Sequence, residues 1–222
     1  MTDQVIQSAL DRYMNTLNAD QHGRDHSWEH CYKQFYDAHN GSSFDIDYLS
    51  LHLAFYLASW GMYRGSSFLL QKDYKIHRDA VEIILNKDYK PLLGIECQKL
   101  SENLELLKAL YDSLEYHYDS VKRKTDRLNS NTPPSSTLIT KVLLGTLGCV
   151  PAYDEYFSKA VRSEKVAPGG YGKNSIEKLI KFYEAHFEVL EDRRKQLIYA
   201  PGYPQMKLLD MLFWQIGKDL PC

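Results

Sequence analysis

The sequence contains few cysteines, and no two of them are close together. Cys31, Cys97, Cys149 and Cys222 form no C-x-x-C pair. A disulfide framework and a cysteine-based zinc site both need cysteines at short, regular spacing, so we expect neither. The pattern is typical of a reduced, cytoplasmic protein, and nothing in it predicts a metal ion or another cofactor.

Long hydrophobic runs are also missing. The most apolar stretch, residues 51–70 (LHLAFYLASWGMYRGSSFLL), is interrupted by His52, Arg64, glycines and serines. A membrane-spanning helix needs about 20 mostly apolar residues without such polar groups. The first residues, MTDQVIQSALDRY, have the pattern of an amphipathic helix rather than the apolar core of a signal peptide. We therefore expect no membrane partner.

Charge of one sign is not in excess, since the formal net charge is −2. This excludes a protein that binds nucleic acid through a positive field over its whole surface. Two local basic clusters remain, one formed by Lys122, Arg123, Lys124 and Arg127 and the other by residues 193–195. Each cluster is either a solvated helix surface or a contact for nucleic acid.

Apolar residues recur at helical spacing through nearly the whole chain, and no run alternates as a strand does. Ser27 is a candidate N-cap, and the Asn40-Gly41 pair is typical of a helix end. We expect the long apolar helix to bend near Gly61 or Gly65. The predicted helices cover residues 3–18, 27–40, 45–70, 76–87, 95–128, 137–148, 152–162, 175–197 and 205–217, with loops at 129–136, 163–174 and 199–204.

This succession of helices predicts an all-α fold. The length suits a single globular domain over residues 1–222. Such a domain has room for two lobes with a cleft between them. One lobe would hold the N-terminal helices and the C-terminal helix, and the other would hold residues 76–162.

The segment STLITKVLLGTLGCVPAYDEYF, residues 136–157, places a carboxylate directly after an apolar helix. The helix follows Ser136 and Thr137, and its apolar run ends before Pro151. Asp154 comes three residues later, among aromatic side chains. An acid at this point caps the next helix, and the rings around it exclude water.

This order of residues resembles the core of the helix-hairpin-helix DNA glycosylase superfamily. The tail MKLLDMLFWQIG, residues 206–217, resembles the closing helix of uncharacterised bacterial proteins with a similar core. The resemblance implies a two-lobed all-α architecture, DNA with a flipped base as the partner, and Asp154 as the catalytic residue. Two features depart from the family. The hairpin loop, NTPPSS, has prolines in place of glycines, and Ser136 stands where lyase-active members have a lysine, with Lys141 farther along the helix. The resemblance therefore implies a monofunctional enzyme that uses water.

The chemistry gives Asp154 a defined task. Cleavage of an N-glycosidic bond builds positive charge on the sugar, and a nearby carboxylate stabilises that charge and orients or deprotonates the attacking water. The dipole of the following helix would keep the carboxylate ionised. Helix capping alone is the simpler interpretation of Asp154, and the two roles are compatible.

A glycosylase also holds the extruded base between flat surfaces. The candidates for base binding are aromatic and polar residues of the motif and of the polar break in the apolar stretch: Trp60, Tyr63, Arg64, Ser66, Tyr153 and Tyr156. The candidates for contacts with the DNA backbone are Ser135, Ser136, Thr137, Lys141, Lys122 and Arg123. Close helix packing and an internal ion pair of Arg64 are the alternative interpretation of the polar break.

Three histidines lie four residues apart in the segment HGRDHSWEHCY, beside two acids. On one continuous helix, His22, His26 and His30 would place ligands for a metal on one face. Gly23 and the candidate cap Ser27 interrupt such a helix. We therefore predict no metal site in this segment.

Several functions remain open at this point. The first is a monofunctional DNA glycosylase that removes a damaged or modified base, in repair or in defence against modified phage DNA. The second is a non-catalytic helical module that binds DNA or a protein, as the low charge and the missing hairpin glycines indicate. A metal-dependent hydrolase that uses His22, His26 and Glu29 is a third hypothesis, and it requires stoichiometric metal.

Overall fold

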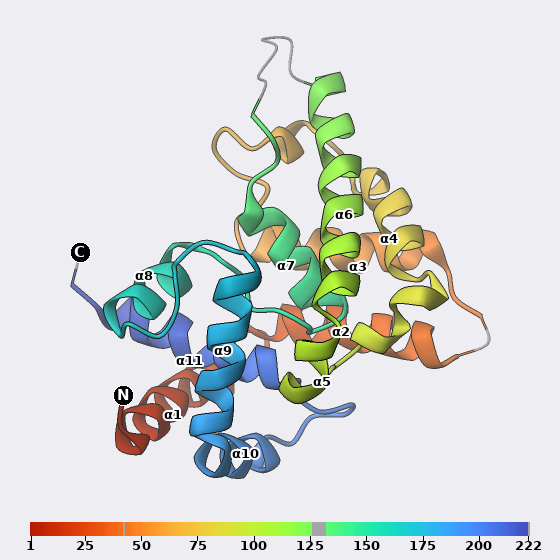
Figure 1. Ribbon diagram of the computed structural model, residues 1–222. Helices are drawn as coiled ribbons and strands as arrows, with labels where there is room; N and C mark the ends of the chain where they lie inside the picture. Colours follow the sequence, from red (N-terminus) through yellow and green to blue (C-terminus); the bar gives the residue numbers. More distant parts are fainter. Residues whose placement is uncertain (42, 126–131, 222) are drawn as a thin grey trace.

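A computed structural model describes residues 1–41, 43–125 and 132–221 of the chain (Figure 1). These residues form α-helices and short 3₁₀-helices joined by loops, without a strand among them. The predicted all-α class is therefore confirmed. Arg127, Cys222 and the first part of the predicted loop, residues 129–131, lie outside the described residues.

The bounds of the helices follow the apolar pattern closely in four places. The predictions for α1, α2, α7 and α11 agree with the structure to within about two residues. The α-helices are α1 (Asp3–Ala19), α2 (His26–Asn40), α3 (Ile46–Ser59), α4 (Arg78–Ile84), α5 (Cys97–Glu102), α6 (Leu104–Thr125), α7 (Ser136–Thr146), α8 (Glu155–Ser163), α9 (Lys173–Ala185), α10 (Phe187–Gln196) and α11 (Gln205–Asp219). The 3₁₀-helices are η1 (Phe68–Gln71), η2 (Tyr74–His77) and η3 (Lys87–Leu92).

The helix predicted over residues 45–70 ends early, at the first glycine where we expected a bend. Gly61 has a φ of 76°, in the left-handed region that favours glycine. The backbone N–H of Met62 then donates to the carbonyl of Leu57 at 2.9 Å. This is the Schellman arrangement, which stops a helix. Residues 60–67 therefore form a loop, and the polar side chains predicted inside a helix lie on that loop.

Two other long predicted helices are each broken once. The helix predicted over residues 95–128 is divided at Asn103, whose side-chain amide donates to the carbonyl of Lys99 at 2.8 Å. The helix predicted over residues 175–197 is divided at His186, where φ reaches −120°. The apolar spacing continues through both breaks, so the periodicity alone does not reveal them.

The C-terminal helix lies at the centre of the fold. The side chains of α11 are buried from Gln205 to Gly217, and the helix packs against α8, α1, α9 and α10 (Figure 1). In the rest of the fold, α3 packs against α2, α4 and α7. Buried apolar side chains from all these helices form one continuous cluster. The division into two lobes stays a prediction.

The described cysteines are free thiols in the interior. Cys31, Cys97 and Cys149 are buried and unpaired. Burial raises the pKa of the Cys97 thiol to about 12, so this thiol stays protonated at neutral pH. Within the part of the chain that the structure describes, no helix is both long enough and apolar enough to cross a bilayer.

Candidate functional site

Hydrogen bonds to the backbone hold the segment between α7 and α8 in place. The hydroxyl of Thr137 donates to the carbonyl of Tyr153 at 2.8 Å. The backbone N–H of Tyr153 donates to the Thr140 hydroxyl at 3.0 Å. One residue earlier, the N–H of Ala152 donates to the Asp210 carboxylate at 3.0 Å. The chain therefore enters α8 in a direction fixed by both α7 and α11.

Asp154 is the N-cap residue of α8. One carboxylate oxygen, Oδ1, accepts a hydrogen bond from the backbone N–H of Phe157 at 3.1 Å. The other oxygen, Oδ2, lies 3.7 Å from the ammonium nitrogen of Lys141. The side chain is 15% exposed. The capping geometry inferred from the sequence is thus present, and it leaves the second oxygen facing away from the helix.

Lys141 forms the second half of this arrangement, which the sequence did not reveal. We expected it to contact the DNA backbone, but the residue is 5% exposed and its ammonium donates to the carbonyl of Trp60 at 2.9 Å. Thr137 and Lys141 are four residues apart and therefore lie on one face of α7. This four-residue spacing is the sequence signal from which the position of both residues beside Asp154 could have been predicted.

The pair titrates differently from free side chains. Burial raises the pKa of Asp154, while the nearby Lys141 ammonium acts in the opposite direction. Burial likewise lowers the pKa of Lys141, and Asp154 opposes that change. Burial disfavours the charged form of each partner, whereas their mutual attraction favours both charges.

A second buried ion pair lies on α11, close enough to influence the charges of the first. Lys207 is 2.9 Å from Asp210 and both side chains are almost fully buried. Although burial opposes its charge, Asp210 raises the pKa of Lys207. The ammonium also lies 5.1 Å from the ring centroid of Trp28 and 5.9 Å from that of Trp60, so aromatic faces stabilise it further.

The Asp154 carboxylate opens into a cavity of about 280 Å³. Its walls combine aromatic rings, cations and acids: Trp60, Tyr156 and Trp214; Arg24, Arg64 and Lys141; Asp154 and Glu155; with Gly61, Met62 and Thr137. The rings of Trp60 and Tyr156 each meet Trp214 edge to face, at centroid distances of 5.6 and 5.5 Å. We call this space the Asp154 cavity.

Arg24 and Trp214 are among the cavity residues that the sequence did not predict. The guanidinium of Arg24 lies 5.1 Å from the ring centroid of Trp60, and Trp214 comes from the tail that resembled a closing helix. They are far from the motif in sequence and reach it only through packing. The indole Nε1 of Trp60 is buried and has no hydrogen-bond partner among the described residues.

Three of the predicted base-binding residues, Tyr63, Ser66 and Tyr153, do not line the Asp154 cavity. Tyr153 is buried, and its hydroxyl is 2.9 Å from that of Ser175. The hydroxyl of Tyr63 is 2.7 Å from Nε2 of His77. Tyr153 belongs to the protein interior and Tyr63 is half-buried against the core, and each holds neighbouring segments together. Trp60, Arg64 and Tyr156 do line the cavity.

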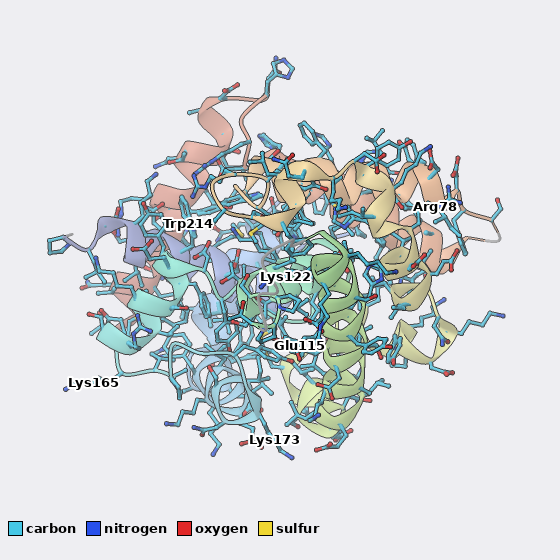
Figure 2. The ribbon with its side chains drawn as sticks, turned by 90° about the horizontal axis from the view of Figure 1, so that it is seen from above. Arg78, Glu115, Lys122, Lys165, Lys173 and Trp214 are labelled. Atoms are coloured by element: carbon cyan, nitrogen blue, oxygen red, sulfur yellow. The ribbon has the colours of Figure 1, made fainter. Side chains whose placement is uncertain are left out.

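A second, more open hollow of about 510 Å³ adjoins the first, and we call it the loop hollow. Its walls come from the 60–67 loop, η1, α6 and the start of α7: Gly61, Met62, Arg64, Gly65, Ser66, Ser67, Phe68, Lys122, Pro133, Pro134, Ser135 and Leu138. The predicted residues Ser66, Ser135 and Lys122 are therefore brought together here. Figure 2 looks down on this end of the molecule and labels Lys122 on α6 and Trp214 on α11.

Lys122, Arg123 and Ser135, which we predicted to contact the DNA backbone, already have partners within the chain. Lys122 donates to the carbonyl and the hydroxyl of Thr132 at 2.7 and 2.8 Å. Arg123 is paired with Asp119 at 2.7 Å. Ser135 caps α7. Ser136 lies in the first turn of that helix, outside both hollows.

The histidine segment is occupied by internal contacts. Nδ1 of His26 is 2.6 Å from Glu29, and its Nε2 is 3.1 Å from the carbonyl of Leu17. Glu29 also accepts a short hydrogen bond from the Tyr203 hydroxyl. Within the described ranges, no group of three or more histidine, cysteine or acidic side chains is arranged to hold a metal ion.

Comparisons of the chain with protein-family models, with curated proteins and with solved structures found no significant match. A function for the chain therefore rests on the chemistry of its own residues. The features that a function must explain are the partly exposed Asp154 carboxylate, the adjacent Lys141 ammonium, and the aromatic, cation-lined cavity into which they open.

Proposed function

We propose that the chain hydrolyses the N-glycosidic bond of a damaged or modified base in DNA, with Asp154 as the catalytic carboxylate. The observation that carries the proposal is the position of this carboxylate. It is fixed at a helix N-terminus, it keeps one oxygen clear of the cap bond, and it opens into a cavity lined by three aromatic rings.

The position suits the charge that develops in this reaction. As the bond to the base breaks, the sugar gains positive charge, and a fixed carboxylate in a poorly hydrated site stabilises it more strongly than in water. Lys141 and the α8 N-terminus favour the ionised form of Asp154, while burial makes it a stronger base than a free aspartate. Asp154 would both stabilise the sugar and accept a proton from the attacking water.

The cavity supplies surfaces for a base. Tyr156 offers a ring face for stacking, and Trp214 braces the rings of Trp60 and Tyr156 edge to face. The Trp60 ring, which already carries the Arg24 and Lys141 cations, forms a wall of the cavity. The Nε1–H of Trp60 is a buried donor that an acceptor on a bound base would satisfy. A base inserted here would be out of its stack, as the reaction requires.

Water, rather than an amine, is the proposed nucleophile. The Lys141 ammonium is engaged with the Trp60 carbonyl and faces Asp154. Ser136, at the start of α7, carries no amine. A monofunctional enzyme leaves an intact abasic site and forms no imine with its product.

The test is abasic-site formation on a panel of DNAs containing uracil, alkylated, oxidised and phage-type modified bases. We expect wild type to release a base from at least one substrate, without strand cleavage and without trapping by borohydride. Asp154→Asn should release none. A substrate found among repair lesions would place the activity in repair, and one found among phage modifications would place it in defence. Release by Asp154→Asn at the wild-type rate would refute the proposal.

A non-catalytic DNA- or protein-binding module is the second candidate. The internal pairing of Lys122 and Arg123 favours the protein-binding form of this candidate, because it leaves few cations for a duplex. If binding occurs and no substrate loses a base, this candidate replaces the enzyme, and Asp154 is a helix cap only.

A further inference from the structure

We infer that the site takes a single-stranded polynucleotide, which runs through the Asp154 cavity and the loop hollow with a backbone phosphate held by Arg64 where the two meet. The inference deepens the proposed function, because it names the form of the substrate. It does not need the chemistry to occur, since it concerns binding alone.

The two hollows form one continuous path. Gly61, Met62 and Arg64 line both of them. In Figure 1 the 60–67 loop, in orange to tan, passes over the start of α7. A ligand with its base beside Asp154 would therefore extend past the loop into the second hollow. An extended ligand fits this shape better than a compact one.

Arg64 stands at the junction with its charge available. The residue is exposed, and its guanidinium makes no hydrogen bond or ion pair within the described residues. Its side chain folds onto Gly61, where a Cβ would come within 2.8 Å of the guanidinium Nε. Gly61 thus ends α3 and also makes room for this guanidinium. A guanidinium presents a planar set of N–H donors that suits a phosphate diester.

A second cation lines the base site. Arg24 is exposed and stacks over Trp60 at 5.1 Å from the ring centroid. Arg24 and Arg64 therefore both line the cavity, and the acids that share it are Asp154 and Glu155. A nucleotide within a strand carries a phosphate on each side of its sugar, and this pair of arginines matches that arrangement.

The loop hollow has the composition of a single-strand site. Phe68 and Pro133 offer apolar surface for bases, and the hydroxyls of Ser66 and Ser67 can donate to the backbone. Binding of single strands combines such stacking surfaces with a few cations along the backbone.

The two hollows are less suited to a duplex than to a single strand. A duplex requires several phosphate contacts over a broad positive face. Here the neighbouring cations Lys122 and Arg123 are bound to the protein, and the net charge is −2. Pro133 and Pro134 cannot donate backbone N–H groups to a phosphate.

The test measures binding by the anisotropy of labelled oligonucleotides of about twelve nucleotides, using wild type and Asp154→Asn. The arms are single-stranded DNA, the same sequence as RNA, the duplex, and competition by a free nucleoside monophosphate. We expect single strands to bind at least about tenfold more tightly than the duplex. Equal or tighter duplex binding, or binding of the monophosphate without any binding of the oligonucleotide, would overturn the inference.

Variants locate the site. Arg64→Ala and Arg24→Ala should each weaken single-strand binding by about tenfold and lower its salt dependence by about one ion. Arg64→Lys keeps the positive charge but not the planar set of N–H donors. It should therefore weaken single-strand binding less than Arg64→Ala does. Arg78→Ala is the matched control, because this arginine, labelled in Figure 2, pairs with Asp47 and lines neither hollow; it should bind as wild type does. Circular dichroism checks that each variant folds.

The two proposals fail separately. Intact single-strand binding without base release from any substrate would contradict the chemistry and leave the inference standing. Base release from duplex substrates without a single-strand preference would support the chemistry and contradict the inference. Unchanged binding by Arg64→Ala would show that the strand does not pass the junction.

Discussion

The ammonium nitrogen of Lys141 lies 3.7 Å from the Asp154 carboxylate, although the two residues come from different helices. Both side chains are largely buried, and both line the same cavity. The same ammonium is anchored to the backbone carbonyl of Trp60 at 2.9 Å. Lys141 therefore joins the capped carboxylate to the loop that carries the cavity's polar wall.

This relationship predicts how activity depends on pH. The pKa of Asp154 is raised above the usual 3.8 by burial, so base release should fall on the acid side at a pH above that value. Lys141→Gln removes the charge that opposes this shift, and the acid limb should then move to higher pH. The measurement is the pH profile of single-turnover base release. A limb that stays in place would show that the pair is not coupled.

A buried histidine should make stability fall in mild acid. His77 lies between the hydroxyls of Tyr63 and Tyr118, each at 2.7 Å. Burial, with a smaller contribution from nearby His117, lowers its pKa to about 3 from the usual 6.5. The unfolded chain takes up the proton first, so stability decreases as pH falls below about 6.5 and continues to decrease until about 3.

Urea unfolding at several pH values measures this effect. Wild type should lose about 2 kcal/mol from this group between pH 7 and pH 5. His77→Gln does not titrate, so its unfolding free energy should change less over the same range, whatever its stability at pH 7. His39, whose pKa burial lowers to about 4, titrates in both proteins and serves as the internal reference. Parallel curves would contradict the assignment.

The sequence predicts most of the fold and only part of the site. Apolar spacing is a local property, and it located α7 and the central helix α11 to within about two residues. Asp154 followed from the same local pattern. Arg24 and Trp214 reach the cavity from opposite ends of the chain, and a local sequence pattern cannot predict such a long-range contact. Tyr153 looked equivalent to Tyr156 in sequence, but only packing decides which ring turns inward.

A buried carboxylate on α10 should stabilise the fold down to low pH. Glu191 accepts hydrogen bonds from Arg194, Tyr183 and Gln205 at 2.7 to 2.9 Å. Burial opposes its charge, yet these bonds lower its pKa to about 2 from the usual 4.5. Its contribution is complete above about pH 4.5 and is lost as pH falls toward 2.

The matching substitution is Glu191→Gln, which should cost about 2 kcal/mol at pH 7 because it weakens charge-assisted bonds in the interior. The control is Glu105→Gln. This residue is 80% exposed and pairs with Lys173 on the surface. Its substitution should therefore lower the unfolding free energy by no more than about 0.5 kcal/mol. Similar losses from the two variants would contradict the role given to the Glu191 cluster.

The closest approach of α8 and α11 predicts a packing effect. A Cβ on Gly217 would collide with the backbone of Tyr156. Gly217→Ala should therefore destabilise the fold by about 1–3 kcal/mol, despite the better helix propensity of alanine. Gly170→Ala is the control, because nothing lies within 4 Å of its Cβ position. Thermal unfolding distinguishes the two, and a stabilised Gly217→Ala would mean that the helices separate easily.

The most direct measurement is the single-turnover rate of base release by Asp154→Asn, relative to wild type and to Asp45→Asn. Asparagine caps a helix about as well as aspartate, so both variants should keep their folds. Asp45 caps α3 with bonds to Asp47 and Tyr48 and lies outside the Asp154 cavity. We expect Asp154→Asn to lose at least about a hundredfold in rate and Asp45→Asn to match wild type. Equal rates in all three proteins would contradict the assignment of Asp154 as the catalytic carboxylate.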